Sequence, residues 1–189
     1  VHCWELFGSR SWLVAFCFFA QGAQSAQAPA SSSAWLWSPV AIAAVANLFG
    51  PPASITGNEF ALRFGREGLI AAAMIASGIL TGLLGFSSHF PWFVIAALAM
   101  LHMTLVMGDS SALTAGMVMH SPPQARGATM AIHSMLGFGA GFISPLVFGA
   151  VLDLAGGNAS ASAWGAAFLA LGAGAVIAPW LLGFTRRAG

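Results

Sequence analysis

The sequence is divided into six long apolar segments, each of which could cross a membrane as a helix. A transmembrane helix needs about 20 consecutive and mainly apolar residues. The segments that meet this length are residues 1–20, 36–57, 68–86, 91–120, 127–155 and 161–185. We therefore expect an all-α membrane protein with six transmembrane helices.

Charged residues are too rare for a water-soluble protein. They make up 6% of the 189 residues, whereas soluble domains carry about 25%. So few charges cannot cover the surface of a soluble globule of this size, and membrane lipid is the expected solvent for most of it. The formal net charge is +1, so nothing indicates a nucleic-acid partner.

The arginines test the number of spans, because loops that face the cytoplasm collect Lys and Arg. Arg63 and Arg66 lie between the second and third segments, Arg126 lies between the fourth and fifth, and two more arginines follow the sixth. These places are two spans apart, so six helices would put all of them on one side. We expect that side, with the C-terminus, to be cytoplasmic, in a bacterial inner membrane. The outer ends would carry interfacial tryptophans, namely Trp35, Trp37 and Trp92.

Two segments contain helix breakers, which membranes tolerate because neighbouring groups satisfy the freed carbonyls. The second segment contains Gly50-Pro51-Pro52, for which helix packing alone and a kink that matters for movement both remain open, and the fifth contains the Gly137/Gly141 pair and Pro145. Glycines four apart let helices approach closely. Cys3 and Cys17 are roughly 21 Å apart on one helix, beyond disulfide reach, and are expected to be free buried thiols.

Ionisable residues inside the apolar segments are the candidate functional residues. Such residues cost about 2.5–3.5 kcal/mol each at the bilayer centre and persist mainly where they pair or line a wet cavity. His2, Glu5 and Ser9 share one helical face. Helical rise places one set near the midplane, namely Arg10, Asn47 and His102. A second set lies in the cytoplasmic half, namely Glu5, Asp109 and His133.

Acid and base at equal depth could neutralise each other across helices, and we assign the six residues to a substrate and proton pathway. The simpler alternative is that they are buried pairs that fix helix packing. Segments 68–86 and 161–185 carry no charge in their apolar cores and are expected at the periphery. No metal-ligand spacing or catalytic motif occurs, so neither a metal, a cofactor nor an enzyme activity is expected.

Residues 58–66, Asn58-Glu59-Phe60-Ala61-Leu62-Arg63-Phe64-Gly65-Arg66, resemble the cytoplasmic loop signature of the major facilitator superfamily, G-x-L-A-D-R-x-G-R. Arg63, Gly65 and Arg66 match the signature, while Asn58 replaces its first glycine and Leu62 its aspartate. Residues 108–157 are similar to the tenth and eleventh helices of bacterial members, and residues 2–8 to the seventh.

The resemblance implies the C-terminal six-helix half of a twelve-helix secondary transporter. Its two halves would rock around a small-molecule substrate near the midplane. The chain starts at Val1, and we expect that its beginning, with the N-terminal half, has been lost. Arg10 would hold an anionic group, while Glu5, Asp109 and His133 would take a coupling proton. Arg63 and Arg66 would brace the cytoplasmic gate.

Two other functions remain open at this point. A six-helix channel subunit would need a repeated constriction and a chain complete in itself. A membrane-embedded enzyme could use Glu5, Asp109 and His133 for acid–base chemistry, but no nucleophile or metal cluster accompanies them.

Overall fold

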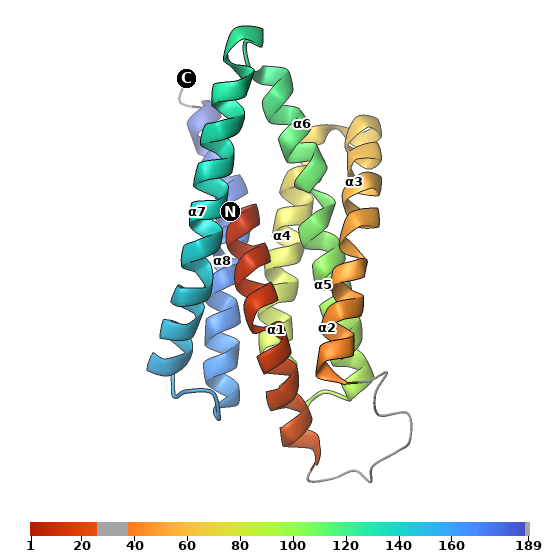
Figure 1. Cartoon of the computed structure of the whole chain (residues 1–189), viewed down its shortest axis with the longest axis vertical. Coiled ribbons are helices and arrows are strands. Elements are labelled where there is room, and N and C mark those ends of the chain that lie inside the picture. The colour runs from red at the N-terminus through yellow and green to blue at the C-terminus, as the bar shows by residue number, and fades with distance from the viewer. Residues whose placement is uncertain (26–37, 188–189) are drawn as a thin grey trace.

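A computed structural model describes residues 1–25 and 38–187, and these residues form a bundle of helices without a β-strand (Figure 1). The predicted interfacial residues Trp35 and Trp37 lie outside the described residues, whereas Trp92 begins a helix. The elements are α1 (His2–Ser25), α2 (Pro39–Leu48), α3 (Gly50–Phe64), α4 (Arg66–Gly85), the short 3-10 helix η1 (Ser87–His89), α5 (Trp92–Gly108), α6 (Ser110–His120), the 3-10 helix η2 (Pro123–Ala125), α7 (Arg126–Leu154) and α8 (Ala161–Arg187).

Five helical stretches in the described residues are long and apolar enough to cross a membrane. They are Pro39–Phe64, Arg66–Gly85, Trp92–His120, Pro123–Leu154 and Ala161–Trp180. The predicted number of six is therefore corrected to five. The exception is α1, which is a helix of 24 residues but carries Glu5 and Arg10, which lower its mean hydropathy.

Two of the predicted spans are interrupted helices. Phe49 separates α2 from α3, because Pro51 and Pro52 have no N–H to continue the hydrogen bonds of the helix. The structure thus shows an irregularity at Gly50-Pro51-Pro52. Asp109 separates α5 from α6 without a proline, and Trp92–His120 still forms one stretch long and apolar enough to span a membrane, as the sequence predicted.

The expected loop at residues 58–67 is mostly helical. α3 continues to Phe64 and α4 begins at Arg66, so only Gly65 connects them, with φ of +98°. Such a backbone conformation favours glycine. The charged residues of this stretch are good helix formers, so charge alone did not mark a loop.

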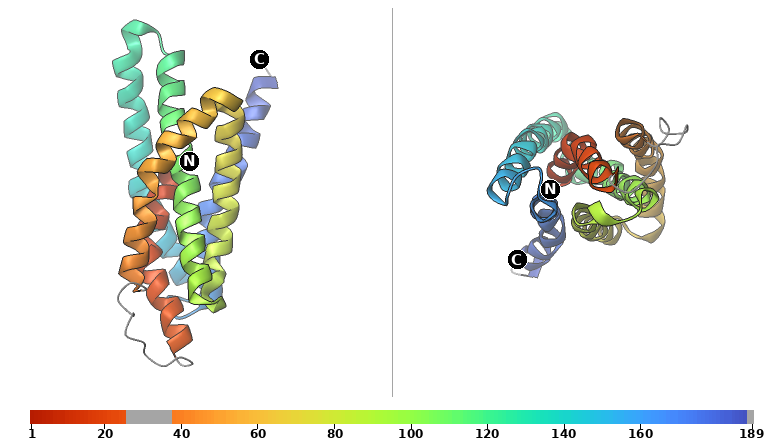
Figure 2. Two further views of the ribbon diagram at one scale, coloured as in Figure 1. Left: turned by 90° about the vertical axis from the view of Figure 1, so that its right-hand side faces the viewer. Right: turned by 90° about the horizontal axis from the view of Figure 1, so that it is seen from below.

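All the arginine-bearing connections lie at one end of the bundle, which we call the arginine end (Figures 1 and 2). It contains the α3–α4 connection, η2 and the end of α8. Their location on one side agrees with the prediction from the sequence.

The opposite end is packed with aromatic rings, and we call it the aromatic end. The ring centroids of Phe16 and Phe168 are 5.2 Å apart, and those of Phe148 and Phe168 are 5.0 Å apart. Trp164 is also buried, and its indole Nε1 donates to the carbonyl of Asn158 at 2.8 Å. This cluster joins α1, α7 and α8.

Small residues allow the closest helix approach, as expected for membrane bundles. At the α4–α8 contact, a Cβ added to Gly78 would lie 2.6 Å from the carbonyl oxygen of Gly172. In α7, the ring of Pro145 prevents a hydrogen bond to the carbonyl of Gly141. The Ser144 hydroxyl lies 3.4 Å from that carbonyl oxygen and donates to it instead.

Candidate functional site

The interior of the bundle holds two carboxylates, each close to a histidine. Glu5 on α1 is 2% exposed, and Asp109 at the α5–α6 interruption is 3% exposed. Apolar side chains surround the region, so each carboxylate needs hydrogen-bond partners from the protein to offset the loss of water. The two sites obtain these partners in different ways.

The Glu5 carboxylate is held by two hydroxyl groups of α4. The Ser77 hydroxyl donates to Glu5 Oε2 at 2.9 Å, and the Thr81 hydroxyl donates to Oε1 at 2.5 Å. Ser77 and Thr81 are four residues apart and therefore lie on one face of the helix. Both are buried, so α4 presents a polar pair to α1 inside an otherwise apolar contact.

His102 on α5 completes this first site. Its Nδ1 is 3.2 Å from Thr81 Oγ1 and 4.0 Å from Glu5 Oε1. The longer distance exceeds that of a hydrogen bond, so Thr81 lies between acid and imidazole. The ring has no exposed surface, and its Nε2 has no hydrogen-bond partner among the described residues. We call this group of residues the Glu5 cluster: Glu5, Ser77, Thr81 and His102.

The second site joins α1 to the helix interruption. His2 Nδ1 lies 2.8 Å from Asp109 Oδ1, a hydrogen-bonded distance at which the imidazole N–H donates to the carboxylate. The His2 side chain is 13% exposed and that of Asp109 is 4% exposed. The pair therefore stands closer to open space than the Glu5 cluster does.

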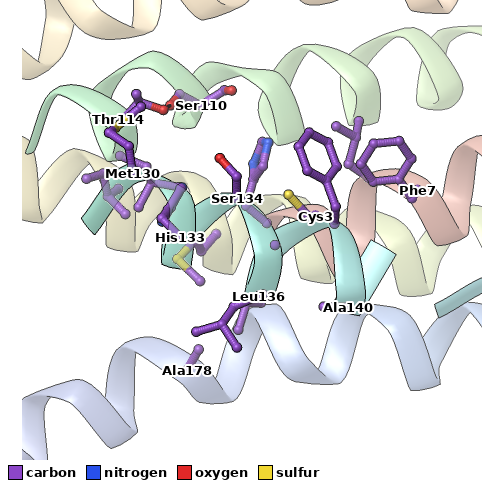
Figure 3. Close-up of a pocket in the computed structure, with 18 residues that line it drawn as sticks. Cys3, Phe7, Ser110, Thr114, Met130, His133, Ser134, Leu136, Ala140 and Ala178 are labelled. Carbon is purple, nitrogen blue, oxygen red and sulfur yellow. Dashed lines mark hydrogen bonds between the residues drawn. The ribbon is translucent and has the colours of Figure 1, made fainter. Parts of the chain in front are cut away.

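A cavity of about 570 Å³ lies beside the second site, in the arginine half of the bundle. Figure 3 draws the residues that line it. α1, α4, α6, α7 and α8 all contribute to its wall. Most of the lining is apolar, and its polar side chains are those of His2, Cys3, Ser110, Thr114, His133 and Ser134. Such a site, mainly apolar with a few polar groups, is typical of small-molecule binding.

The residues predicted from the sequence do not all meet. Glu5 and His102 come together, although the sequence placed them in different layers. Asp109 pairs with His2, which was noted only as sharing a helical face with Glu5. The layer assignment fails because depth was counted along each helix from its own end, and helices that cross at different angles have no common depth scale.

Arg10 and Asn47 lie outside both sites. The guanidinium of Arg10 is beside Gly50, at the α2–α3 interruption, and its Nε has no hydrogen-bond partner among the described residues. Asn47 Nδ2 donates to the carbonyl of Ala43 at 2.7 Å, so its amide serves its own helix.

His133 is exposed and lines the cavity, apart from the two carboxylates. The predicted grouping of His133 with Glu5 and Asp109 is therefore replaced by two separate acid–histidine sites. His133 is the one predicted proton-pathway residue that faces the cavity without a hydrogen bond or ion pair to another described residue.

Sequence reasoning missed Ser77 and Thr81, because the 68–86 segment carries no charge and was expected at the periphery. A signal was present, since two hydroxyl residues spaced i, i+4 in an apolar helix form a polar stripe. The sequence alone does not show which helix that stripe faces.

The two signature arginines differ in their surroundings. Arg66 Nη1 donates to the carbonyl of Ala112 on α6 at 2.8 Å, while Arg63 is exposed. Ser54 and Ser111 are also hydrogen-bonded at 2.5 Å. Together these contacts join α3 and the start of α4 to α6 at the arginine end.

Comparison of the chain with known protein families and with curated protein sequences finds no match. Among the described residues, no group of three or more His, Cys, Asp or Glu side chains could hold a metal ion.

Proposed function

We propose that this chain is part of a secondary transporter that moves a small solute across a membrane by alternating access, coupled to protons. The observation that carries the proposal is the pair of buried acid–histidine sites among apolar helices, one of them beside a cavity. Intramembrane ionisable residues are costly and usually mark substrate or proton pathways.

In this proposal α1 is a sixth membrane-spanning helix. Its 24 residues correspond to about 36 Å of helix, enough to cross the hydrocarbon core. Glu5, which lowers its mean hydropathy, is shielded from lipid by Ser77, Thr81 and His102. A helix whose polar groups face the bundle interior can be less apolar overall than one exposed to lipid.

Alternating access needs a site that is closed on one side at a time. The cavity lies in the arginine half, while stacked rings fill the aromatic end. The interruptions at Phe49 and Asp109 support the same function, because transporter sites are typically formed where membrane helices are broken.

The family we propose is the major facilitator superfamily, with this chain as the C-terminal six-helix half. Supporting features are the signature-like residues 58–66 at the α3–α4 junction and the location of that junction at the arginine end. The arginine end would be cytoplasmic in an inner membrane. A partner six-helix half, or lipid, would cover exposed apolar side chains of α7, which include Ile132, Met135, Leu136, Phe138, Phe142 and Ile143.

Within this function, Arg10 is proposed to bind an anionic group of the solute, with Asn47 nearby on α2. Glu5 and Asp109 are proposed to take the coupling proton, each with its histidine partner, and His133 to bind solute in the cavity. Arg63 and Arg66 would brace the helix ends at the cytoplasmic gate.

The test uses protein expressed from its complete reading frame and reconstituted in vesicles with a pH-sensitive dye inside. A pH gradient is imposed, and a panel of small organic anions and drug-like cations is added one at a time. We expect at least one solute to accelerate the collapse of the gradient. Glu5→Gln and Asp109→Asn should slow this collapse at least about tenfold, which corresponds to 1.4 kcal/mol in the barrier.

Thr104→Val is the matched control. Thr104 donates to the carbonyl of Met100 at 2.8 Å and belongs to neither site, so this variant should behave as the native protein does. An ion current that does not depend on any solute would contradict the proposal and indicate a pore instead. Arg10→Ala with unchanged uptake would remove the role given to Arg10.

A further inference from the structure

Thr81 stands between the two titratable groups of the Glu5 cluster. Its Oγ1 is 2.5 Å from Glu5 Oε1 and 3.2 Å from His102 Nδ1, while those two atoms are 4.0 Å apart. Protons move along hydrogen bonds, and a 4.0 Å separation is too long for one. The hydrogen-bonded path for a proton between Glu5 and His102 therefore runs through the Thr81 hydroxyl.

We propose that the hydroxyl of Thr81 relays a proton between Glu5 and His102. This inference rests on the proposed proton-coupled function and specifies how its most buried site works. Thr81 is then a relay residue, and Ser77 is a positioning residue that holds Glu5 Oε2.

The hydrogen-bonding capacity of Thr81 suits this role. A hydroxyl has one proton to donate and can accept two hydrogen bonds. Thr81 Oγ1 has three neighbours, namely Glu5 Oε1, His102 Nδ1 and the carbonyl oxygen of Ser77 at 2.8 Å. A rotation of its O–H bond changes which neighbour receives the proton, without moving any helix.

The relay step balances in atoms and charge. The O–H bond of protonated Glu5 breaks as a new O–H bond forms on Thr81 Oγ1. The original O–H bond of Thr81 breaks as an N–H bond forms on His102 Nδ1, which requires the tautomer with its proton on Nε2. The products are a Glu5 carboxylate and a His102 imidazolium, so the net charge of the pair is unchanged.

The surroundings favour exchange within the pair over loss of the proton. Glu5 is 2% exposed and His102 has no exposed surface, so an uncompensated charge on either would be costly. The other titratable groups at this level are His2 on α1 and Asp109 after α5, which bond to each other. In the described residues of α4, α7 and α8, no charged side chain forms an ion pair with Glu5 or His102.

The experiment is time-resolved infrared spectroscopy of the protein from its complete reading frame, in lipid nanodiscs, after a proton is released by light from a caged acid. The carboxyl band of Glu5 is identified by its loss in Glu5→Gln, and the ring band of His102 by isotope-labelled histidine and its loss in His102→Asn. In the native protein the two bands should relax with one time constant. In Thr81→Val the time constant of the ring band should be at least about tenfold longer than that of the carboxyl band.

Three variants distinguish a relay from a packing role. Thr81→Ser keeps the hydroxyl and should restore a single time constant. Thr104→Val removes a similarly back-bonded hydroxyl elsewhere and should leave it unchanged. If Thr81→Val does not assemble, Thr81→Ala removes the same hydroxyl without the branched side chain. The proposal is overturned if the two bands still relax together in the variant that lacks the Thr81 hydroxyl. It is also overturned if the ring band lags behind the carboxyl band in Thr104→Val.

The readout requires no transported solute. If no solute is transported but the infrared relaxation depends on Thr81, the proposed function is rejected and the relay is kept. If transport depends on a solute but the relaxation does not depend on Thr81, the relay is rejected and the proposed function is kept.

Discussion

The two ends of the bundle are built in different ways. At the aromatic end, rings from α1, α7 and α8 pack mainly edge to face, and Trp164, Phe16, Phe148 and Phe168 are almost fully buried. At the arginine end, helices are interrupted, a cavity of about 570 Å³ opens and the His2–Asp109 pair borders it. The difference shows that side chains fill the interior toward one end, whereas the cavity lies in the half that carries the arginines.

The Glu5 cluster lies between these two regions. On its arginine side the next titratable pair, His2 and Asp109, is partly exposed, whereas aromatic packing follows on the other side. A proton that reaches Glu5 would therefore come from the cavity.

The largest effect is expected from Trp164→Ala, which empties the centre of the aromatic end. Removal of a buried aromatic ring usually costs about 3–5 kcal/mol. The control is Trp180→Ala on the same helix, because Trp180 is 67% exposed and should change stability by less than about 1 kcal/mol. Unfolding of the purified protein in denaturing detergent measures both, and equal losses would contradict a rigid aromatic end.

Gly85→Ala should have the next largest effect. An added Cβ there would lie 2.5 Å from the Cβ of the fully buried Phe168, and overpacking of a dense contact costs about 1–3 kcal/mol. Gly127→Ala at the arginine end meets nothing within 4 Å and should be neutral or stabilise the helix by up to about 1 kcal/mol. Thermal unfolding of the two variants should therefore shift in opposite directions or differ by several degrees.

Arg66→Ala should have the smallest effect on stability of the three. It removes the hydrogen bond from Arg66 to the carbonyl of Ala112, and bonds to charged groups contribute about 1.5–3 kcal/mol, less where solvent reaches them. Arg63→Ala, at an exposed arginine of the same helix junction, should change almost nothing. A limited-proteolysis time course would show faster cleavage at the arginine end in Arg66→Ala alone. Equal rates would mean that this hydrogen bond does not hold the start of α4 to α6.

Hydropathy predicted most of the fold. A helix must satisfy its own backbone inside lipid, so length and apolarity locate the helices well, and the spacing of Arg63, Arg66 and Arg126 predicted one shared end. The exact ends were less predictable. α3 continues through residues 58–64, which include the good helix formers Glu59, Ala61, Leu62 and Arg63. α1 is less apolar than the five other stretches because it carries Glu5 and Arg10.

The candidate site was predicted less well, for a geometric reason. Helical rise gives depth, but the rotation of each helix about its axis depends on packing that one sequence does not show. Glu5 and His102 were recognised singly, and their pairing through Thr81 was not. The span that contains Asp109 was predicted, but the break between α5 and α6 at this residue was not.

The two native cysteines allow the most direct test of the central claim, that in the conformation described the interior is open in the arginine half and closed by packing at the aromatic end. Cys3 lines the cavity and Cys17 is fully buried in the packed core. A membrane-impermeant maleimide is added to sealed vesicles of each orientation, and a peptide tag after Gly189 reports on which side of the membrane the C-terminus lies. The account predicts that Cys3 reacts faster from the side of the C-terminus than from the opposite side, and that Cys17 reacts from neither. Reaction of Cys3 that is faster from the opposite side, or reaction of Cys17 from either side, would contradict it.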